Sequence, residues 1–185
     1  MLSLIAWCLV LVSIAFGYYS LVPPRAVTAD APATEFSADR AMRHVEAIAR
    51  EPHPMGTAAL DKVRRYLVGE LEELGLVPEF QAISAPNYFE SGEPVDVVNV
   101  MATIAGLDST GSIALMAHYD TVPATPGAND NSASVSAVLE VARSLVSGPP
   151  MRNDVLLLFT DAEEPAPRYG STAFVAASPE FEDVG

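Results

Sequence analysis

Residues 112–164 read SIALMAHYDTVPATPGANDNSASVSAVLEVARSLVSGPPMRNDVLLLFTDAEE, and this stretch decides the fold. Two continuous apolar runs, residues 112–117 and 154–160, have the pattern of β-strands that are buried on both faces of a sheet. Between them, residues 130–146 carry apolar side chains at helical spacing. A strand, a helix and a second strand in this order predict two parallel strands joined by a crossover helix.

Polar side chains follow each of these segments. His118 and Asp120 come just after the first strand, Asp130 lies at the start of the connecting helix, and Glu163 and Glu164 follow the second strand. Ligands of an open α/β sheet bind at the carboxyl ends of its strands, so we expect these side chains to share one edge. Each cluster alone is a weak signal, because an H-x-D pair, a helix-capping aspartate or a glutamate pair in a loop usually has a structural role. Their combination and order favour a site.

The residue types indicate metal chemistry. Imidazole and carboxylate ligands suit Zn²⁺, and the two oxygens of Asp130 could bridge a pair of ions about 3.5–4 Å apart. A metal-bound histidine usually donates its second N–H to a carboxylate, which is the role we expect for Asp120 beside His118. Adjacent residues in an extended chain point in opposite directions. One of Glu163 and Glu164 could therefore bind metal while the other acts as a general base on a water molecule.

The remaining segments predict an α/β domain. Ser37 can cap a helix that runs to about Arg50, and a second helix fits residues 57–75. We expect strands at residues 77–84 and 95–105 and a last helix at about residues 170–177. The other two histidines have structural interpretations, His44 on a helix surface or interface and His53 in a loop between two prolines.

The N-terminus has a different character. Residues 1–22 carry no charged side chain and are long enough to cross a bilayer core of about 30 Å, so we expect a transmembrane anchor, with a cleaved signal peptide as the alternative. Residues 23–36 have the composition of a linker. Arg25, the nearest basic residue, by itself favours a cytoplasmic position for the chain that follows the anchor.

Composition excludes several classes of function. The chain has 185 residues, which suffices for one domain with a short appendage, and its net charge of −14 argues against nucleic acid as a partner. Its only cysteine, Cys8, lies in the apolar N-terminus, so neither a disulfide framework nor a thiolate metal site is expected. Nothing in the sequence indicates the oligomeric state.

Three motifs resemble a known family. The segments H-Y-D-T-V-P (residues 118–123), P-G-A-N-D-N-S-A-S (126–134) and F-T-D-A-E-E (159–164) are similar to those of the di-zinc aminopeptidases. Residues 36–57, FSADRAMRHVEAIAREPHPMGT, behind an N-terminal anchor look most like its membrane-bound branch, the endoplasmic reticulum metallopeptidase and vacuolar membrane protease type. The resemblance runs from about Phe36 to the end of the chain.

The resemblance implies a fold, an activity and a role for each site residue. The fold would be a three-layer sandwich with a mixed, partly parallel sheet, and the activity that of a zinc exopeptidase acting on peptides. His118 would bind one zinc ion, Glu164 the other, Asp130 would bridge them, and Glu163 would be the general base. The family also often has a cis peptide bond after its bridging aspartate. We expect a membrane-attached protein with an extracytoplasmic or lumenal peptidase domain.

The chain departs from the family pattern at its end. Relatives supply one more carboxylate and one more histidine further downstream, whereas this chain ends at Gly185 and has no histidine after His118. We therefore expect residues 37–185 to be the N-terminal part of a peptidase domain, with a fold incomplete at the C-terminus and poor catalysis by this chain alone. Asp183 lies too near the end to be assigned as the missing acid. Ala162 stands where many relatives have glycine.

Two alternatives remain. The related zinc carboxypeptidase and amidohydrolase family shares H-x-D-T-V-P and a glutamate pair, but its bridging aspartate usually lies in a glycine-rich segment, unlike G-A-N-D-N-S-A-S here. A non-catalytic binding module with the same fold is the other. The presence of His118, Asp120, Asp130, Glu163 and Glu164 argues against it.

Overall fold

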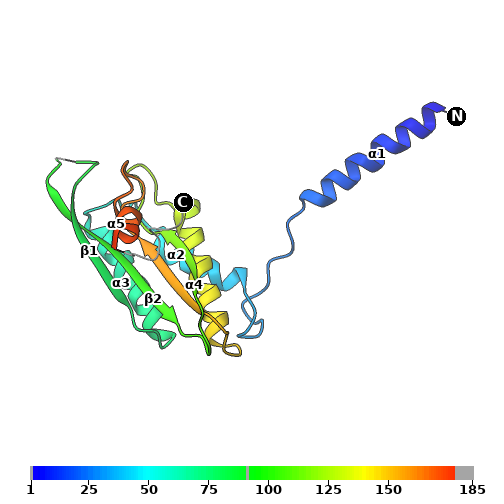
Figure 1. The fold of residues 1–185 in the computed structure, drawn as a ribbon. Coiled ribbons are helices and arrows are strands. Elements are labelled where there is room, and N and C mark those ends of the chain that lie inside the picture. The colour runs from blue at the N-terminus through cyan, green and yellow to red at the C-terminus, as the bar shows by residue number, and fades with distance from the viewer. Residues whose placement is uncertain (1, 91, 178–185) are drawn as a thin grey trace.

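The computed structural model describes residues 2–90 and 92–177 (Figure 1). Its helices and strands follow the order predicted from the sequence. Along the chain they are α1 (Leu2–Leu21), α2 (Ala38–Ile48), α3 (Ala58–Glu73), β1 (Glu79–Pro86), β2 (Pro94–Ile104), β3 (Ser112–His118), the irregular segment η1 (Ala128–Ser132), α4 (Ala133–Val146), β4 (Asp154–Thr160) and α5 (Tyr169–Ala177).

One mixed sheet organises the domain. Its strand order is β1-β2-β4-β3, with β1–β2 and β2–β4 antiparallel and β3–β4 parallel. The parallel register places His118 opposite Thr160, so that β3 and β4 end together. The predicted parallel pair with its crossover helix is therefore confirmed, and the sheet is mixed, as the family resemblance implies.

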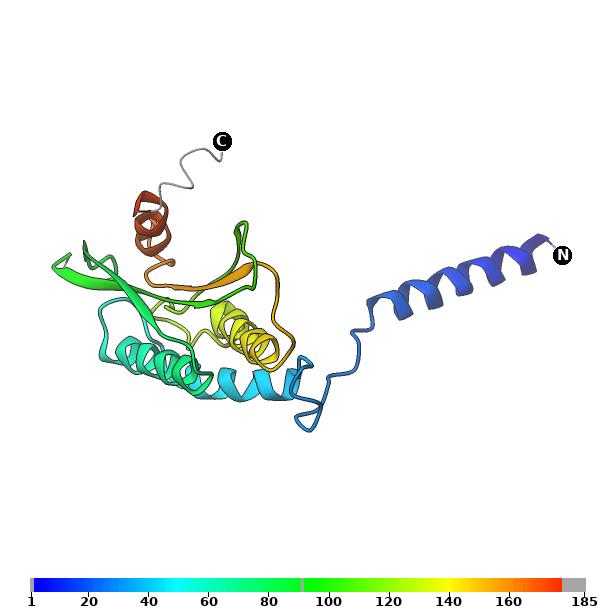
Figure 2. The same cartoon turned by 60° about the horizontal axis from the view of Figure 1, so that its bottom comes forward.

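The helices form two layers around the sheet. Figure 2 shows α2, α3 and α4 on one face and α5 on the other. The main core lies between the three helices and the sheet, and its fully buried side chains include Leu67 of α3, Leu139 of α4 and Phe159 of β4. This is the three-layer sandwich expected from the sequence.

The helix starts follow from side-chain caps. Ser37 Oγ accepts a hydrogen bond from the Arg40 N–H at 3.2 Å, and Thr57 Oγ1 accepts one from the Leu60 N–H at 3.2 Å. These caps satisfy backbone donors that a helix start leaves without partners. Gly75 follows α3 with a φ of 76°, a conformation that favours glycine and ends a helix.

One prediction about burial was wrong. Both apolar runs were expected to be buried on both faces, but only β4 is, because it lies between β2 and β3. β3 is the last strand of the sheet within the described residues, and its Ile113 and Met116 side chains are more than half exposed. An apolar run indicates that a strand tends to be buried, but it does not indicate whether the strand lies in the centre or at the edge of its sheet.

Helix α1 extends away from the domain (Figure 1). Residues Leu4–Leu21 have a mean hydropathy of 2.0, and within the described residues this is the single helix long and apolar enough to cross a membrane. Residues 27–36, which have the composition of a linker, lie against the domain rather than free of it.

Candidate metal centre

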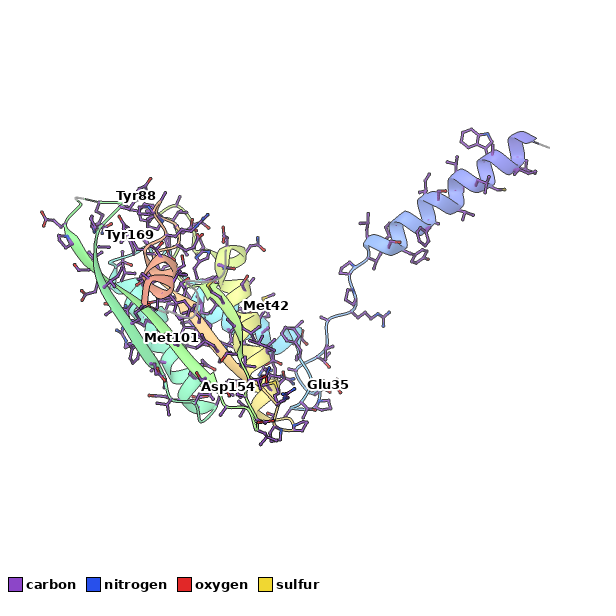
Figure 3. The ribbon with its side chains drawn as sticks, viewed as in Figure 1. Glu35, Met42, Tyr88, Met101, Asp154 and Tyr169 are labelled. Carbon is purple, nitrogen blue, oxygen red and sulfur yellow. The ribbon has the colours of Figure 1, made fainter. Side chains whose placement is uncertain are left out.

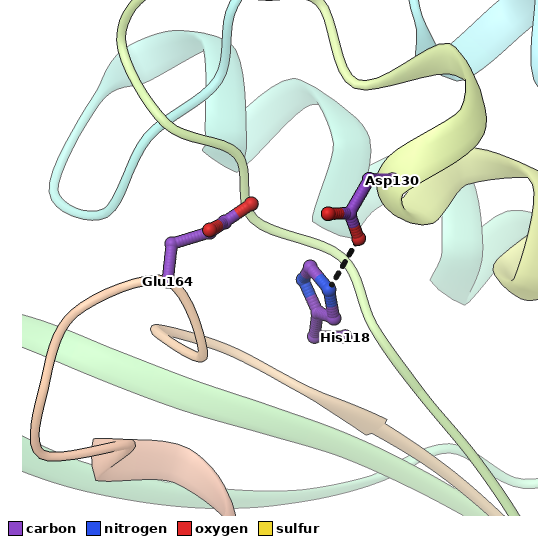
Figure 4. Close-up of side chains that lie close together, drawn as sticks. All are labelled: His118, Asp130 and Glu164. Atoms are coloured by element: carbon purple, nitrogen blue, oxygen red, sulfur yellow. Dashed lines mark hydrogen bonds and ion pairs between the residues drawn. The ribbon is translucent and has the colours of Figure 1, made fainter.

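Three segments bring the predicted site residues to one edge of the sheet. His118 is the last residue of β3, the Glu163–Glu164 pair follows β4, and Asp130 lies in η1 just before α4. The three side chains of His118, Asp130 and Glu164 point toward one another in Figure 4. This is the edge at which the carboxyl ends of parallel strands meet, where ligands of α/β sheets bind.

The distances within this cluster suit metal ligands. His118 Nε2 lies 3.2 Å from Asp130 Oδ1. One ligand atom from each of His118, Asp130 and Glu164 lies within 4.8 Å of the others. Zinc–ligand bonds are about 2.0–2.2 Å long, so small side-chain rotations would let these atoms share ions. The donor set of one imidazole and two carboxylates therefore fits Zn²⁺.

The backbone around Asp130 is irregular. Asp130 and Asn131 have non-helical torsion angles, and the peptide bond between them is cis, as the family resemblance implies. Gly127 has a φ of 66°, and a Cβ placed there would lie 2.6 Å from the Asp130 carbonyl oxygen and also overlap the Thr121 side chain. Only glycine fits this turn, which leaves the Asp130 carboxylate exposed toward His118.

Asp120 is a buried residue that connects the loop after β3 to the glutamate pair. Its side chain is fully buried, and its two oxygens accept the backbone N–H groups of Glu163 at 2.9 Å and Glu164 at 3.2 Å. Asp120 Oδ1 also lies 3.4 Å from His118 Nδ1, which leaves Nε2 facing Asp130. The hydrogen bond of His118 Nδ1, at 3.2 Å, is with the backbone carbonyl oxygen of Asp120, so donation to the Asp120 carboxylate stays a prediction. The sequence did not predict the two hydrogen bonds between Asp120 and the backbone of the glutamate pair.

The two glutamates have different surroundings. Glu163 Oε1 accepts a hydrogen bond from Arg168 Nε at 2.5 Å, and its Oε2 lies 3.8 Å from His118 Nε2. Glu164 is the one that joins the potential metal ligands. Ala162, which precedes Glu163, has a φ of 52°, in the left-handed region where glycine is favoured, which gives a physical reason for the glycine that the family resemblance implies at this position. Residues 163–168 line a cavity of about 330 Å³.

The electrostatics of the cluster favour a cation. Burial alone lowers the pKa of His118, but the carboxylates of Asp120, Glu163 and Asp130 outweigh it and raise the pKa to about 9. The pKa of Glu164 is also raised, first by burial and then by the neighbouring carboxylates, although His118 opposes this. The shift of His118 reports a local excess of negative charge, which a bound divalent ion would neutralise.

A buried network beneath the site was not predicted. Asp161 Oδ2 accepts the Val98 N–H at 2.9 Å, and within the described residues its Oδ1 has no hydrogen-bond partner. Burial raises the pKa of Asp161 to about 7. The Asp161 N–H donates to Asn99 Oδ1, which joins the start of the glutamate loop to β2. Sequence reasoning missed these residues because their partners are far away along the chain.

The other two histidines lie outside the cluster. His53 is a loop residue, as predicted, but it is buried, and its backbone N–H donates to Thr121 Oγ1 at 2.9 Å. This bond supports the segment that follows His118. His44 Nδ1 lies 2.6 Å from the Tyr66 hydroxyl between α2 and α3, in agreement with an interface role. Asp183 lies outside the described residues.

Comparison with known proteins identifies the family. Residues 99–184 match the sequence profile of peptidase family M28. A vacuolar membrane protease of Candida albicans is 33% identical over 143 residues, which are 75% of this chain and 16% of that relative. The chain carries an M28 peptidase domain. The resemblance to the membrane-bound branch of the di-zinc aminopeptidase family is thereby confirmed.

Solved structures of other proteins have a fold similar to that of this chain. The chain superposes on Porphyromonas gingivalis glutaminyl cyclase with a TM-score of 0.68 and 27% identity, over 78% of this chain and 54% of that one. A leucine aminopeptidase precursor from Bacteroides thetaiotaomicron gives 0.62 and 28%, over 71% and 48%. The chain thus spans about half of these structures and 16% of the C. albicans relative.

Proposed function

We propose that this chain is part of a membrane-anchored, zinc-dependent exopeptidase of the aminopeptidase type. The observation that carries the proposal is the convergence of His118, Asp130 and Glu164 at the carboxyl edge of the sheet. The M28 match and the protease relatives support a metallopeptidase. The proposal also includes the binding of two zinc ions, the aminopeptidase activity and the role of each site residue. These parts rest on the types and positions of the site residues.

Each residue has a proposed task. His118 would bind one zinc ion through Nε2, Glu164 the second, and Asp130 both. When bound, the ions would acidify a water molecule and polarise the scissile carbonyl. Glu163 would take a proton from that water and deliver it to the leaving amine, as a general base and then acid. Asp120 would hold the His118 ring and, through the two backbone bonds, the glutamate pair.

The position of Arg168 supports different roles for the two glutamates, with Glu164 as metal ligand and Glu163 as general base. Arg168 Nε donates a hydrogen bond to Glu163 Oε1, whereas Glu164 joins His118 and Asp130 in the candidate metal cluster. Adjacent carboxylates would otherwise compete for the same ion. We propose that Arg168 favours Glu164 as the ligand and leaves Glu163 available as the base.

Helix α1 would be the membrane anchor, with the M28 domain on the extracytoplasmic or lumenal side and peptides as substrates. The anchor is supported by the apolar span Leu4–Leu21 and by relatives that are membrane proteins. We propose residues 1–22 as the anchor, residues 23–36 as the connecting segment, of which residues 27–36 pack against the domain, and residues 37–185 as the N-terminal part of the peptidase domain.

Within the described residues, three side chains form the one cluster able to hold metal. Two four-coordinate zinc ions need more protein ligands than this. We therefore expect this chain alone to turn over substrate poorly and to need further donors for full activity. Besides amino-terminal cleavage, two other activities are alternatives. One is carboxy-terminal or amide hydrolysis. The other is cyclisation of an N-terminal glutamine, because a glutaminyl cyclase has a similar structure.

An assay of this chain beside a longer version that continues past Gly185 tests the proposal. The substrates are an aminoacyl amide, an N-blocked peptide with a free carboxyl end and a peptide with N-terminal glutamine, each with zinc and with a chelator. We expect zinc-dependent release from the first substrate by the longer chain and far less by the shorter. Glu163→Gln in the longer chain should abolish turnover and retain zinc. Turnover that persists in Glu163→Gln would refute the proposed role of the base, and zinc binding without any turnover would favour a binding module.

A further inference from the structure

Residues 27–37, which we call the strap, are fastened to the domain by two arginines. Arg40 of α2 donates through Nη1 to the carbonyl oxygens of Ala29 at 2.7 Å and Ala31 at 2.9 Å, and through Nη2 to that of Glu35 at 2.7 Å. Arg143 of α4 donates to the carbonyl oxygens of Ala33 at 2.5 Å and Glu35 at 2.7 Å. With a longer bond of 3.4 Å from Arg40 Nη2 to the Pro32 carbonyl oxygen, six bonds from two planar guanidinium groups hold this short segment in one path.

A buried carboxylate joins the two arginines. The Glu140 side chain of α4 is fully buried and accepts hydrogen bonds from Arg40 Nε at 3.0 Å, Arg143 Nε at 2.6 Å and the Ser37 N–H at 2.8 Å. Burial alone raises the pKa of Glu140, but the bonds from Arg143, Ser37 and Arg40 outweigh it and hold the pKa below its usual value. Ser37 Oγ closes the strap by donating to the carbonyl oxygens of Val27 and Thr28.

The strap leaves little free chain between the domain and α1. Helix α1 ends at Leu21, and residues 22–26 alone separate it from the first strap residue, Val27. Five residues span at most about 18 Å when fully extended. If α1 crosses a bilayer, the point where the strap meets the domain must lie close to the lipid surface.

The strap and the metal cluster lie at opposite ends of the domain. Arg143 is near the C-terminal end of α4, whereas Asp130 precedes its N-terminal end, and α4 has 14 residues, which makes it about 20 Å long. In Figure 3, Glu35 and Asp154 lie at one end of the domain and Tyr88 and Tyr169 at the other. Asp154 starts β4, and the metal cluster lies past the end of that strand.

The surface of the strap end carries apolar side chains. Val27, Phe36, Leu107 and Val146 are exposed there, alongside the exposed acidic residues Asp30, Glu35 and Asp108. Apolar side chains beside a membrane helix are stabilised at the boundary between lipid headgroups and acyl chains.

We propose that the strap end of the domain is a lipid-facing surface, so that the strap holds the metal edge away from the bilayer and open to peptides in the aqueous phase. This inference rests on the proposed membrane anchor but not on the peptidase chemistry. It also gives a role to the ion pairs of the buried Glu140 with the partly exposed Arg40 and Arg143, which lie outside the metal cluster.

Energy transfer to labelled lipids tests the orientation. A donor dye is attached to Leu107→Cys at the strap end or to Tyr88→Cys at the opposite end, in full chains that also carry Cys8→Ser. The chains are placed in phosphatidylcholine vesicles that contain acceptor-labelled headgroups. We expect transfer from position 107 to exceed that from position 88 by at least about two-fold, because the two ends lie about one α4 length apart.

A flexible insertion separates the strap from other causes. Adding about ten Gly and Ser residues between Pro24 and Arg25 lengthens the free tether without touching the strap, and should reduce the difference between the two labels. Arg40→Met with Arg143→Met should act in the same direction if the domain still folds. Equal transfer from both positions in the vesicle-bound, unmodified chain would overturn the inference, as would a difference that the insertion leaves undiminished. A chain that does not enter vesicles would overturn the anchor itself, whatever its peptidase activity.

Discussion

Asp120 Oδ1, in the loop after β3, accepts a hydrogen bond from the backbone N–H of Glu163, in the loop after β4, at 2.9 Å. The other oxygen of the same carboxylate accepts the N–H of Glu164 at 3.2 Å. A single buried side chain thus holds both proposed catalytic-loop glutamates by their backbone, while it faces the inner nitrogen of the proposed metal-binding histidine. The geometry of the site depends on this carboxylate as much as on the residues that would touch metal.

Replacement of that carboxylate should loosen the glutamate loop. In Asp120→Asn, one acceptor oxygen becomes an NH₂ group that opposes a backbone N–H, and a buried donor left without a partner costs about 1–3 kcal/mol. We expect that loss in the free energy of unfolding, measured by denaturant titration, and a fall of about 10–100-fold in zinc affinity. Asp96→Asn on the exposed surface of β2 is the matched control and should change neither value. Zinc affinity equal to that of the unmodified chain would contradict the role of Asp120.

Zinc should stabilise the folded chain through the described cluster. A ligand at one hundred times its dissociation constant raises the free energy of unfolding by about 2.7 kcal/mol. We expect zinc to raise the Tm of the unmodified chain and a chelator to reverse the effect. Asp130→Asn removes a charged ligand and should weaken zinc binding, measured by titration calorimetry, by at least about tenfold. The exposed Asp108→Asn serves as control, and a similar loss in both variants would argue against Asp130 as a ligand.

Gly127 should not tolerate a side chain. Its φ is 66°, and a Cβ at this position would lie 2.6 Å from the Asp130 carbonyl oxygen, so Gly127→Ala forces the turn to move. We expect thermal unfolding to show a loss of about 1–3 kcal/mol, together with weaker zinc binding. Gly69→Ala is the opposite case, because Gly69 lies in α3 with open space around it and alanine is the better helix former by about 1 kcal/mol. Equal effects of the two substitutions would contradict this account of the turn.

Asp161 should make stability depend on pH. Its usual pKa of 3.8 is raised to about 7, chiefly by burial, so the folded chain retains a proton that the unfolded chain releases. This contribution to stability is complete below about pH 4 and is lost as the pH rises to about 7. Asp161→Asn cannot ionise.

The stability of Asp161→Asn relative to the unmodified chain should therefore increase between pH 4 and pH 7, by up to about 4 kcal/mol. Denaturant unfolding at intervals of pH measures this difference. A difference that stays constant across the window would contradict an ionisation of Asp161 in that range.

The sequence determined the local elements and their order. The apolar run at residues 154–160 coincides with β4, since five consecutive apolar side chains between Asp154 and Thr160 specify one buried strand. Ser37 marked the start of α2, because a hydroxyl cap acts on a backbone N–H three residues away. Convergence of His118, Asp130 and Glu164 followed from the direction of two parallel strands.

Only the tertiary structure decided the contacts between distant residues. Asp120 and Glu163 are 43 residues apart, and Ser37 and Glu140 are 103 apart, so no periodic pattern links them. The exposure of β3 and the path of the strap likewise depend on which elements become neighbours. Periodicity and capping report interactions within a few residues, whereas packing selects partners across the whole chain.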